Sequence, residues 1–129
     1  LAPHSRVSDL FGRLRSFPAR VAEQLEAVPE AAFDFAPPSW EGVPSEALTI
    51  RQQVCHLRDI EIDGYLTRIE RILAEPCPTL PSVDTYGLIA SRQYDVTPPF
   101  EALRDFSAAR EKTLALVGAA APGDFSRRA

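Results

Sequence analysis

The sequence contains little cysteine, glycine or histidine, and it has no long apolar run. Cys55 and Cys77 form no C-x-x-C pair, which argues against a disulfide scaffold and favours two reduced thiols in a cytoplasmic protein. Six glycines beside twelve prolines exclude a collagen-like or Gly/Ser-rich chain. No apolar stretch approaches the roughly 20 residues that span a bilayer, and no signal peptide is evident, although an upstream leader stays open because the chain begins with Leu1. We therefore expect no membrane association.

Length and charge narrow the class of protein further. The 129 residues are 45% hydrophobic and 25% charged, values typical of one globular domain spanning residues 1–129. A net charge of -4 argues against nucleic-acid binding. The charge is unevenly placed, since residues 1–20 hold four arginines against Asp9, whereas residues 21–46 hold six acids and no base. A basic end that docks an acidic partner would explain this pattern, but an ordinary solvated surface is the simpler interpretation.

Apolar residues recur at three- and four-residue spacing in three long segments, as in amphipathic helices. The first stripe extends from Val7 to Val28 and keeps its phase across Pro18, which predicts a kinked helix or two nearly collinear ones. The second segment begins after a capping box at residues 49–52 and ends before Pro76.

The third long segment starts after Thr97 as N-cap and Pro98 at the first helical position, and it ends at Gly118. Its arginines, including Arg110, are expected to be balanced by acids on the same helix surface. Asp84 is placed to cap a short helix in the linker that precedes it. Three long helices, one short helix and no alternating segment predict an all-α, up-down helical bundle.

Residues 29–48 are irregular and rich in proline. A long loop of this kind is uncommon in a compact domain unless its own side chains pack. Phe33, Phe35 and Trp40 are therefore expected to close one end of the bundle. Phe33 and Trp40 would line any small-ligand pocket there, which is the weakest of the functional hypotheses.

His56 is the main candidate for chemistry. At 100° per residue, His56, Asp59 and Asp63 share an arc of about 60° on the second helix. An imidazole beside carboxylates suits metal binding or proton transfer, although a solvated polar face would show the same residues. His4 is the only other histidine. Two histidines and two separated cysteines do not supply the three or four donors that a zinc site typically uses.

Several motifs in series nevertheless resemble the DinB-like superfamily. Residues 48–59 resemble its second-helix signature, which ends in H-l-x-D, although Trp40 precedes this signature at a longer interval than usual. Residues 65–78 continue the second helix, and Asp84, Arg92 and Tyr94 match the linker helix. The matching positions of the third helix are Phe100, Leu103, Phe106, Arg110 and Leu114. The similarity covers about residues 17–126, and its ordered motifs carry the resemblance.

The resemblance implies a four-helix bundle that binds a divalent metal, often nickel or zinc, through three histidines. His56 matches the histidine of the second helix, and Asp59 and Asp63 would then be its supporting partners. The other two histidines form an H-x-x-x-H pair on a fourth helix, which does not follow Phe125-Ser126-Arg127 here. We therefore expect an incomplete metal site and no cofactor in this chain.

Two functional hypotheses follow. The resemblance favours a DinB-like domain, related to metal-dependent hydrolases and thiol transferases, that is catalytically silent without the fourth helix. Its catalytic residues and substrate stay unknown. The alternative is a non-enzymatic interaction module. Three amphipathic helices leave an uncovered groove, which would pair with a second copy of the chain to form a homodimer.

Overall fold

The computed structural model describes residues 3–38, 42–43 and 47–129, and every regular element among them is helical. Two long helices are α1 (Pro3–Ala27) and α5 (Pro99–Ala119). The third long rod consists of α2 (Ile50–Asp59), a π-helix (Ile60–Leu66) and α3 (Thr67–Ala74). The short α4 spans Gly87–Ser91. The all-α bundle with three long helices and one short linker helix is therefore confirmed.

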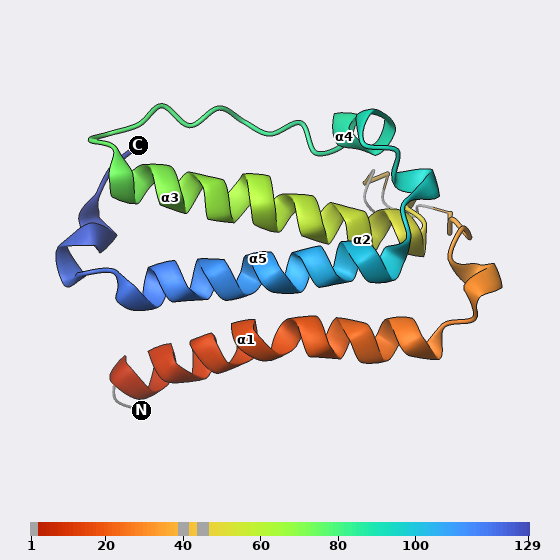
Figure 1. Ribbon diagram of the computed structural model, residues 1–129, viewed down its shortest axis with the longest axis horizontal. Helices are drawn as coiled ribbons and strands as arrows, with labels where there is room; N and C mark the ends of the chain where they lie inside the picture. The colour runs from red at the N-terminus through yellow and green to blue at the C-terminus, as the bar shows by residue number, and fades with distance from the viewer. Residues whose placement is uncertain (1–2, 39–41, 44–46) are drawn as a thin grey trace.

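Helix α5 lies between the other two rods, and it contacts both along its length (Figure 1). The colours of Figure 1 show that α1 runs opposite to the α2–α3 rod, whereas α5 runs in the same direction as that rod. This parallel arrangement requires a long return connection. Residues 75–98 supply it, passing along the outside of the α2–α3 rod and carrying α4 on the way.

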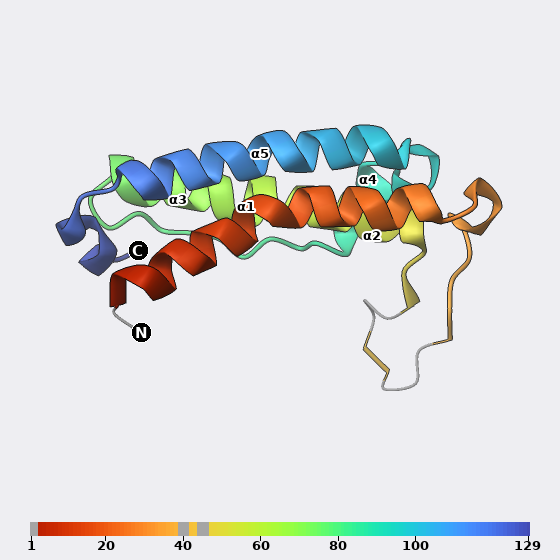
Figure 2. The ribbon, with the colours of Figure 1, turned by 90° about the horizontal axis from the view of Figure 1, so that it is seen from below.

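Helix α1 continues through Pro18 as a single helix. Of the two alternatives predicted from the sequence, this confirms one kinked helix and not two collinear ones. Because proline has no N–H, Pro18 cannot donate the usual helical hydrogen bond to the carbonyl oxygen of Leu14, which lies one turn before it. Arg110 of α5 takes the place of that donor, because its Nη1 donates a hydrogen bond of 3.0 Å to Leu14 O. Figure 2 shows that the N-terminal part of α1 turns away from α5, which opens the bundle at that end.

The second rod starts at the expected capping box. The Thr49 hydroxyl accepts from the Gln52 amide at 3.1 Å, and the Gln52 side chain accepts from the Thr49 amide at 3.0 Å. The rod is not uniform, however, because residues 60–66 form a π-helix with one extra residue in the turn. The apolar stripe of the sequence takes a five-residue step from Leu57 to Ile62 at this place. The wider turn brings Glu61 into the interior, where it is 1% exposed.

The buried core lies toward the end of the bundle where α1 finishes and α5 begins. Eight buried residues form it: Leu25, Phe33, Val54, Cys55, Tyr94, Ala102, Leu103 and Phe106. At the opposite end, large apolar side chains of α1 remain exposed, with Val7 at 54% and Leu10 at 55%. The three rods thus close one half of the interior and leave the other half uncovered.

The segment before α5 differs from the sequence-based expectation at the start of that helix. Asp84 does accept a hydrogen bond from the Gly87 amide at 3.1 Å, but α4 ends at Ser91 because Gln93 adopts a left-handed backbone with φ of 51°. Helix α5 begins at Pro99, one residue later than expected, and the Thr97 hydroxyl donates to the Gln93 carbonyl at 2.9 Å. A search of the described residues finds no helix both long and apolar enough to pass through a membrane.

Candidate functional site

His56 projects from α2 toward the linker. Its ring stacks on Tyr86, with 5.7 Å between ring centroids and 22° between ring planes. The Nδ1 atom is buried and has no hydrogen-bond partner among the described residues. Burial lowers the pKa of His56, and the negative charge of Asp59 opposes this effect only in part. The ring is therefore held neutral, which is the form in which histidine binds metal ions.

Asp59 is 1% exposed, and other groups hold its carboxylate. Arg58 donates to it at 2.8 Å, Arg92 lies 2.9 Å away, and the Tyr94 hydroxyl donates a further hydrogen bond. Burial would raise the pKa of Asp59, but the hydrogen bonds from Arg58 and Tyr94, together with the positive charges of Arg58 and Arg92, outweigh burial and leave the pKa below its usual value. The same burial and the bond to Asp59 raise the pKa of Tyr94. These ion pairs and hydrogen bonds connect α2 to the linker.

Asp63 also faces Arg92, with 2.7 Å between its Oδ2 and Nη1 of the arginine. The structure thus brings Asp59 and Asp63 together on one guanidinium. No hydrogen bond between either carboxylate and His56 occurs in the described residues. The charge of Asp59 raises the pKa of His56, but no hydrogen bond from either carboxylate orients the ring in the described residues. The role of Asp59 and Asp63 as supporting partners of His56 stays a prediction.

The donors of a complete metal centre do not come together in the described part of the chain. No group of three or more histidine, cysteine, aspartate or glutamate residues there could hold a metal ion. Cys55 is buried in the core and burial raises the pKa of its thiol, whereas Cys77 is exposed; both are free thiols. His56, which the DinB-like resemblance predicts as a ligand, would supply one nitrogen, and one nitrogen does not make a centre.

The expected small-ligand pocket can be followed only in part. Phe33 is buried and packs edge-on against Phe100, with 6.3 Å between ring centroids. Together with Arg51 and Pro99, these rings border a cleft of about 520 Å³ where α1 ends and α5 begins. Trp40 lies outside the described residues. The role of Phe33 in ligand binding stays a prediction.

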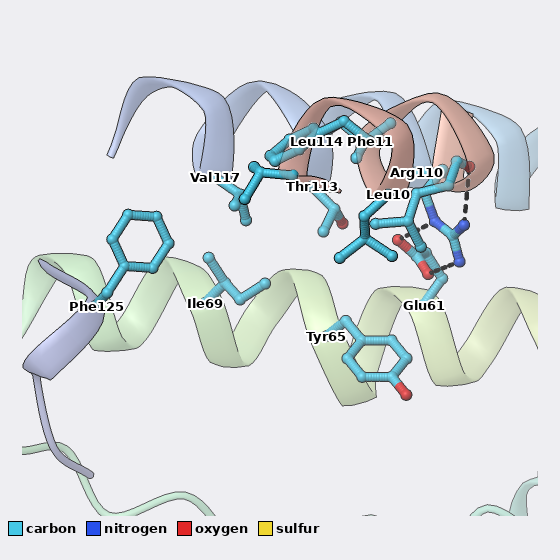
Figure 3. Close-up of a pocket in the computed structure, with 12 residues that line it drawn as sticks. Leu10, Phe11, Glu61, Tyr65, Ile69, Arg110, Thr113, Leu114, Val117 and Phe125 are labelled. Carbon is cyan, nitrogen blue, oxygen red and sulfur yellow. Dashed lines mark hydrogen bonds and ion pairs between the residues drawn. The ribbon is translucent and has the colours of Figure 1, made fainter. Parts of the chain in front are cut away.

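A larger apolar groove runs along the open half of the bundle (Figure 3). It has a volume of about 820 Å³ and lies between α1, the α2–α3 rod and α5. Its lining side chains are Val7, Leu10, Phe11, Leu14, Glu61, Tyr65, Ile69, Arg110, Thr113, Leu114, Val117 and Phe125. Several of them are well exposed, with Tyr65 at 54% and Phe125 at 71%. A contiguous apolar surface of this kind is typical of a binding face.

A buried ion pair marks one end of the groove, and Phe125 marks the other (Figure 3). Arg110 donates to both oxygens of Glu61, at 2.9 and 2.8 Å. Its guanidinium also lies over the Phe106 ring, 5.2 Å from the centroid. The expectation that acids of the same helix would balance Arg110 is therefore wrong, because the π-turn carries Glu61 to it. The five-residue step in the apolar stripe was the only sequence signal for this pair.

We predict that the stability of the protein falls as the pH drops from 7 to 5. The pKa of His56 is lower in the folded state than in the unfolded state, so below about pH 6.5 the unfolded chain binds more protons. Urea unfolding at several pH values measures this slope. His56→Gln should flatten it, and His4→Gln is the matched control for the other histidine. An unchanged slope in His56→Gln would contradict the burial of a neutral ring.

The elements and their directions define a class of fold: an all-α bundle in which a long crossover makes the second and third long helices parallel. YfiT from Bacillus subtilis, described as a probable metal-dependent hydrolase with an unusual four-helix bundle topology, shares this fold. The TM-score is 0.81 at 19% sequence identity, and the match covers 98% of this chain and 68% of YfiT. The bundle expected from the DinB-like resemblance is thereby confirmed as a fold. The sequence matches no protein-family model and no curated protein.

Proposed function

We propose that this chain is the helical core of a DinB-like protein of the metal-dependent hydrolase or thiol transferase type, in which His56 is the ligand from the second helix. The buried, unpartnered Nδ1 of a neutral His56 carries this proposal. A buried nitrogen without a hydrogen-bond partner costs free energy, so its presence calls for an explanation, and a ligand that binds there is one. The fold likeness to YfiT, itself described as a probable metal-dependent hydrolase, supports it.

The described residues do not complete the metal site on their own. Catalytic zinc sites typically use three protein ligands, and no group of three or more histidine, cysteine, aspartate or glutamate side chains in the described residues could hold an ion. Any further donors would have to come from outside the described residues. The chain by itself is therefore proposed to be catalytically silent, and nickel or zinc is the ion expected in a completed form. The arrangement suggests no substrate and no catalytic residue.

Metal titration tests the role of His56. Because a single imidazole binds weakly, we expect the 129-residue chain to take up Ni²⁺ or Zn²⁺ only at millimolar concentration. In ¹⁵N spectra of the imidazoles, Ni²⁺ should broaden the His56 signal, and His56→Gln should leave only the uptake that His4 provides. His4→Gln is the control. Stoichiometric, tight binding that depends on His56 would overturn the silent-site proposal, and broadening confined to His4 would overturn the ligand assignment.

The apolar groove favours a second candidate function, a non-enzymatic module that binds helices. An amphipathic helix binds in a groove through apolar anchors at three- and four-residue spacing. Val7, Leu10 and Leu14 have the same spacing on the α1 wall of the groove, where they offer an apolar surface to such anchors. The homodimer expected from the sequence is one form of such binding and stays a prediction. Light scattering of the wild-type chain and of Leu10→Glu distinguishes a dimer held by this groove from a monomer.

A further inference from the structure

Arginine side chains fasten the linker to the α2–α3 rod on both sides of α4. Before α4, Nη1 of Arg71 donates a hydrogen bond of 2.9 Å to the carbonyl of Thr79. After α4, Arg92 forms an ion pair of 2.7 Å with Asp63. The segment between these attachments, residues 82–91, therefore has both of its ends held against the rod.

The polar contacts within this segment are local. The Gly87 amide donates to the Asp84 carboxylate at 3.1 Å, and no hydrogen bond or ion pair joins residues 82–91 to the α2–α3 rod among the described residues. Leu88 and Ile89 are partly buried and pack against the core, so apolar contacts hold α4 in place. The backbone of the segment is thus fixed, and its exposed side chains are the parts that are free to move.

Tyr86 is the residue of this segment that lies on His56. The two rings are stacked, with 5.7 Å between centroids, and the covered imidazole contains the buried Nδ1 without a partner. Tyr86 itself is 42% exposed, and no hydrogen bond holds its hydroxyl in the described part of the chain. Exposed side chains change rotamer within nanoseconds, so the tyrosine ring can leave the imidazole while the linker backbone stays where it is.

Building on the proposed ligand role of His56, we propose that Tyr86 is a removable cover that controls access to the imidazole. In the closed state, which the structure describes, the tyrosine ring shields one face of the imidazole from water. In the open state the tyrosine side chain turns toward solvent, and a metal ion or another reagent reaches the imidazole. Because only the open fraction of the molecules can react or bind, the cover lowers the reactivity and the metal affinity of His56 by the same factor.

Chemical modification measures this opening without any metal. Diethyl pyrocarbonate modifies neutral imidazoles above about pH 7, and mass spectrometry in a His4→Gln background assigns the product to His56. Tyr86→Ala should raise the rate about two- to tenfold, the factor by which a stacked aromatic pair is favoured. Tyr86→Phe keeps the stacked ring and should react at the wild-type rate. Val96→Ala, at a position of the same linker that is 71% exposed, is the control and should change nothing.

Titration with Ni²⁺ in the same background tests whether a ligand uses the same opening. The dissociation constant from the ¹⁵N signal of His56 should fall in Tyr86→Ala by the factor that the modification rate rises. Circular dichroism checks that each variant is folded. The faster modification should not depend on urea up to about 1 M, because a side-chain rotation exposes little surface, whereas unfolding of the linker would expose more.

The outcomes separate the cover from the ligand role. An unchanged modification rate in Tyr86→Ala would overturn the cover, whatever the nickel titration gives. Faster modification without uptake of Ni²⁺ by His56 in either protein would support the cover and refute the ligand role of His56. Weaker nickel binding in Tyr86→Ala would mean that Tyr86 holds the ring in place for the ion, which contradicts a cover. A rate that rises with urea would assign the opening to the linker backbone and would also overturn the proposal.

Discussion

Arg110→Ala is expected to lower the free energy of unfolding by about 3–5 kcal/mol, because it leaves a buried charge without its partner. Glu61 is 1% exposed, and both of its oxygens accept hydrogen bonds from Arg110. The same substitution removes the donor to the Leu14 carbonyl, which Pro18 cannot replace. Urea unfolding followed by circular dichroism measures the effect.

Two comparisons make this prediction specific. Arg104→Ala, on the exposed face of the same helix, should change stability by less than about 0.5 kcal/mol. Pro18→Ala introduces a backbone N–H that can reach the Leu14 carbonyl, so Arg110→Ala should cost about 1 kcal/mol less in that background. Equal losses in both backgrounds would show that Arg110 does not support the break in α1.

If Arg110→Ala does not fold, the double variant Glu61→Leu, Arg110→Met still tests the ion pair. Replacing both partners of a buried pair by apolar residues is often nearly neutral. We expect a loss of only about 1–3 kcal/mol, most of it from the unsatisfied Leu14 carbonyl. A loss of more than about 3 kcal/mol in the double variant, which leaves no buried charge unpaired, would contradict the explanation by an unpaired Glu61.

Asp59→Ala is the second substitution with a large expected effect, again about 3–5 kcal/mol. It deprives the Arg58 guanidinium and the fully buried Tyr94 hydroxyl of the acceptor that both share. Asp63→Ala is the matched control, because it removes a more exposed carboxylate from the same Arg92 and should cost less than about 1 kcal/mol. Chemical denaturation of both variants measures the two losses in the free energy of unfolding. Equal losses would contradict the special role of the buried Asp59.

Acid unfolding gives an independent measure of Asp59. Its folded-state pKa lies below the ordinary value of 3.8, so its contribution to stability is complete above that value and is lost as the pH falls through the folded-state pKa. Asp59→Asn should therefore be less stable than wild type near neutrality and should lose less further stability at low pH. Parallel pH curves for the two proteins would contradict an ionised, hydrogen-bonded Asp59.

The substitutions also separate structure from function at the candidate site. Asp59 was selected from the sequence because it shares a helical arc with His56, and the structure does place both residues on α2. In the folded chain its carboxylate is held by Arg58 and Tyr94, so Asp59→Ala tests the packing of the linker on α2. Among the buried side-chain nitrogen and oxygen atoms that the structure describes, only the Nδ1 of His56 has no hydrogen-bond partner.

The sequence by itself determined the helices. Three stripes at helical spacing, the Thr49–Gln52 capping box and the prolines that end the segments are local features, and local hydrogen bonding and sterics settle them. The incomplete cover of the bundle also followed from the sequence, because three amphipathic rods have fewer faces to bury against than four do.

Only the tertiary structure decided which polar groups meet. Glu61 and Arg110 are 49 residues apart, and they pair because a π-turn redirects one side chain and α5 passes beside it. Asp59 and Tyr94 meet because the crossover returns to α2. Such contacts depend on how rods are oriented after they pack, and helical periodicity carries no information about that orientation.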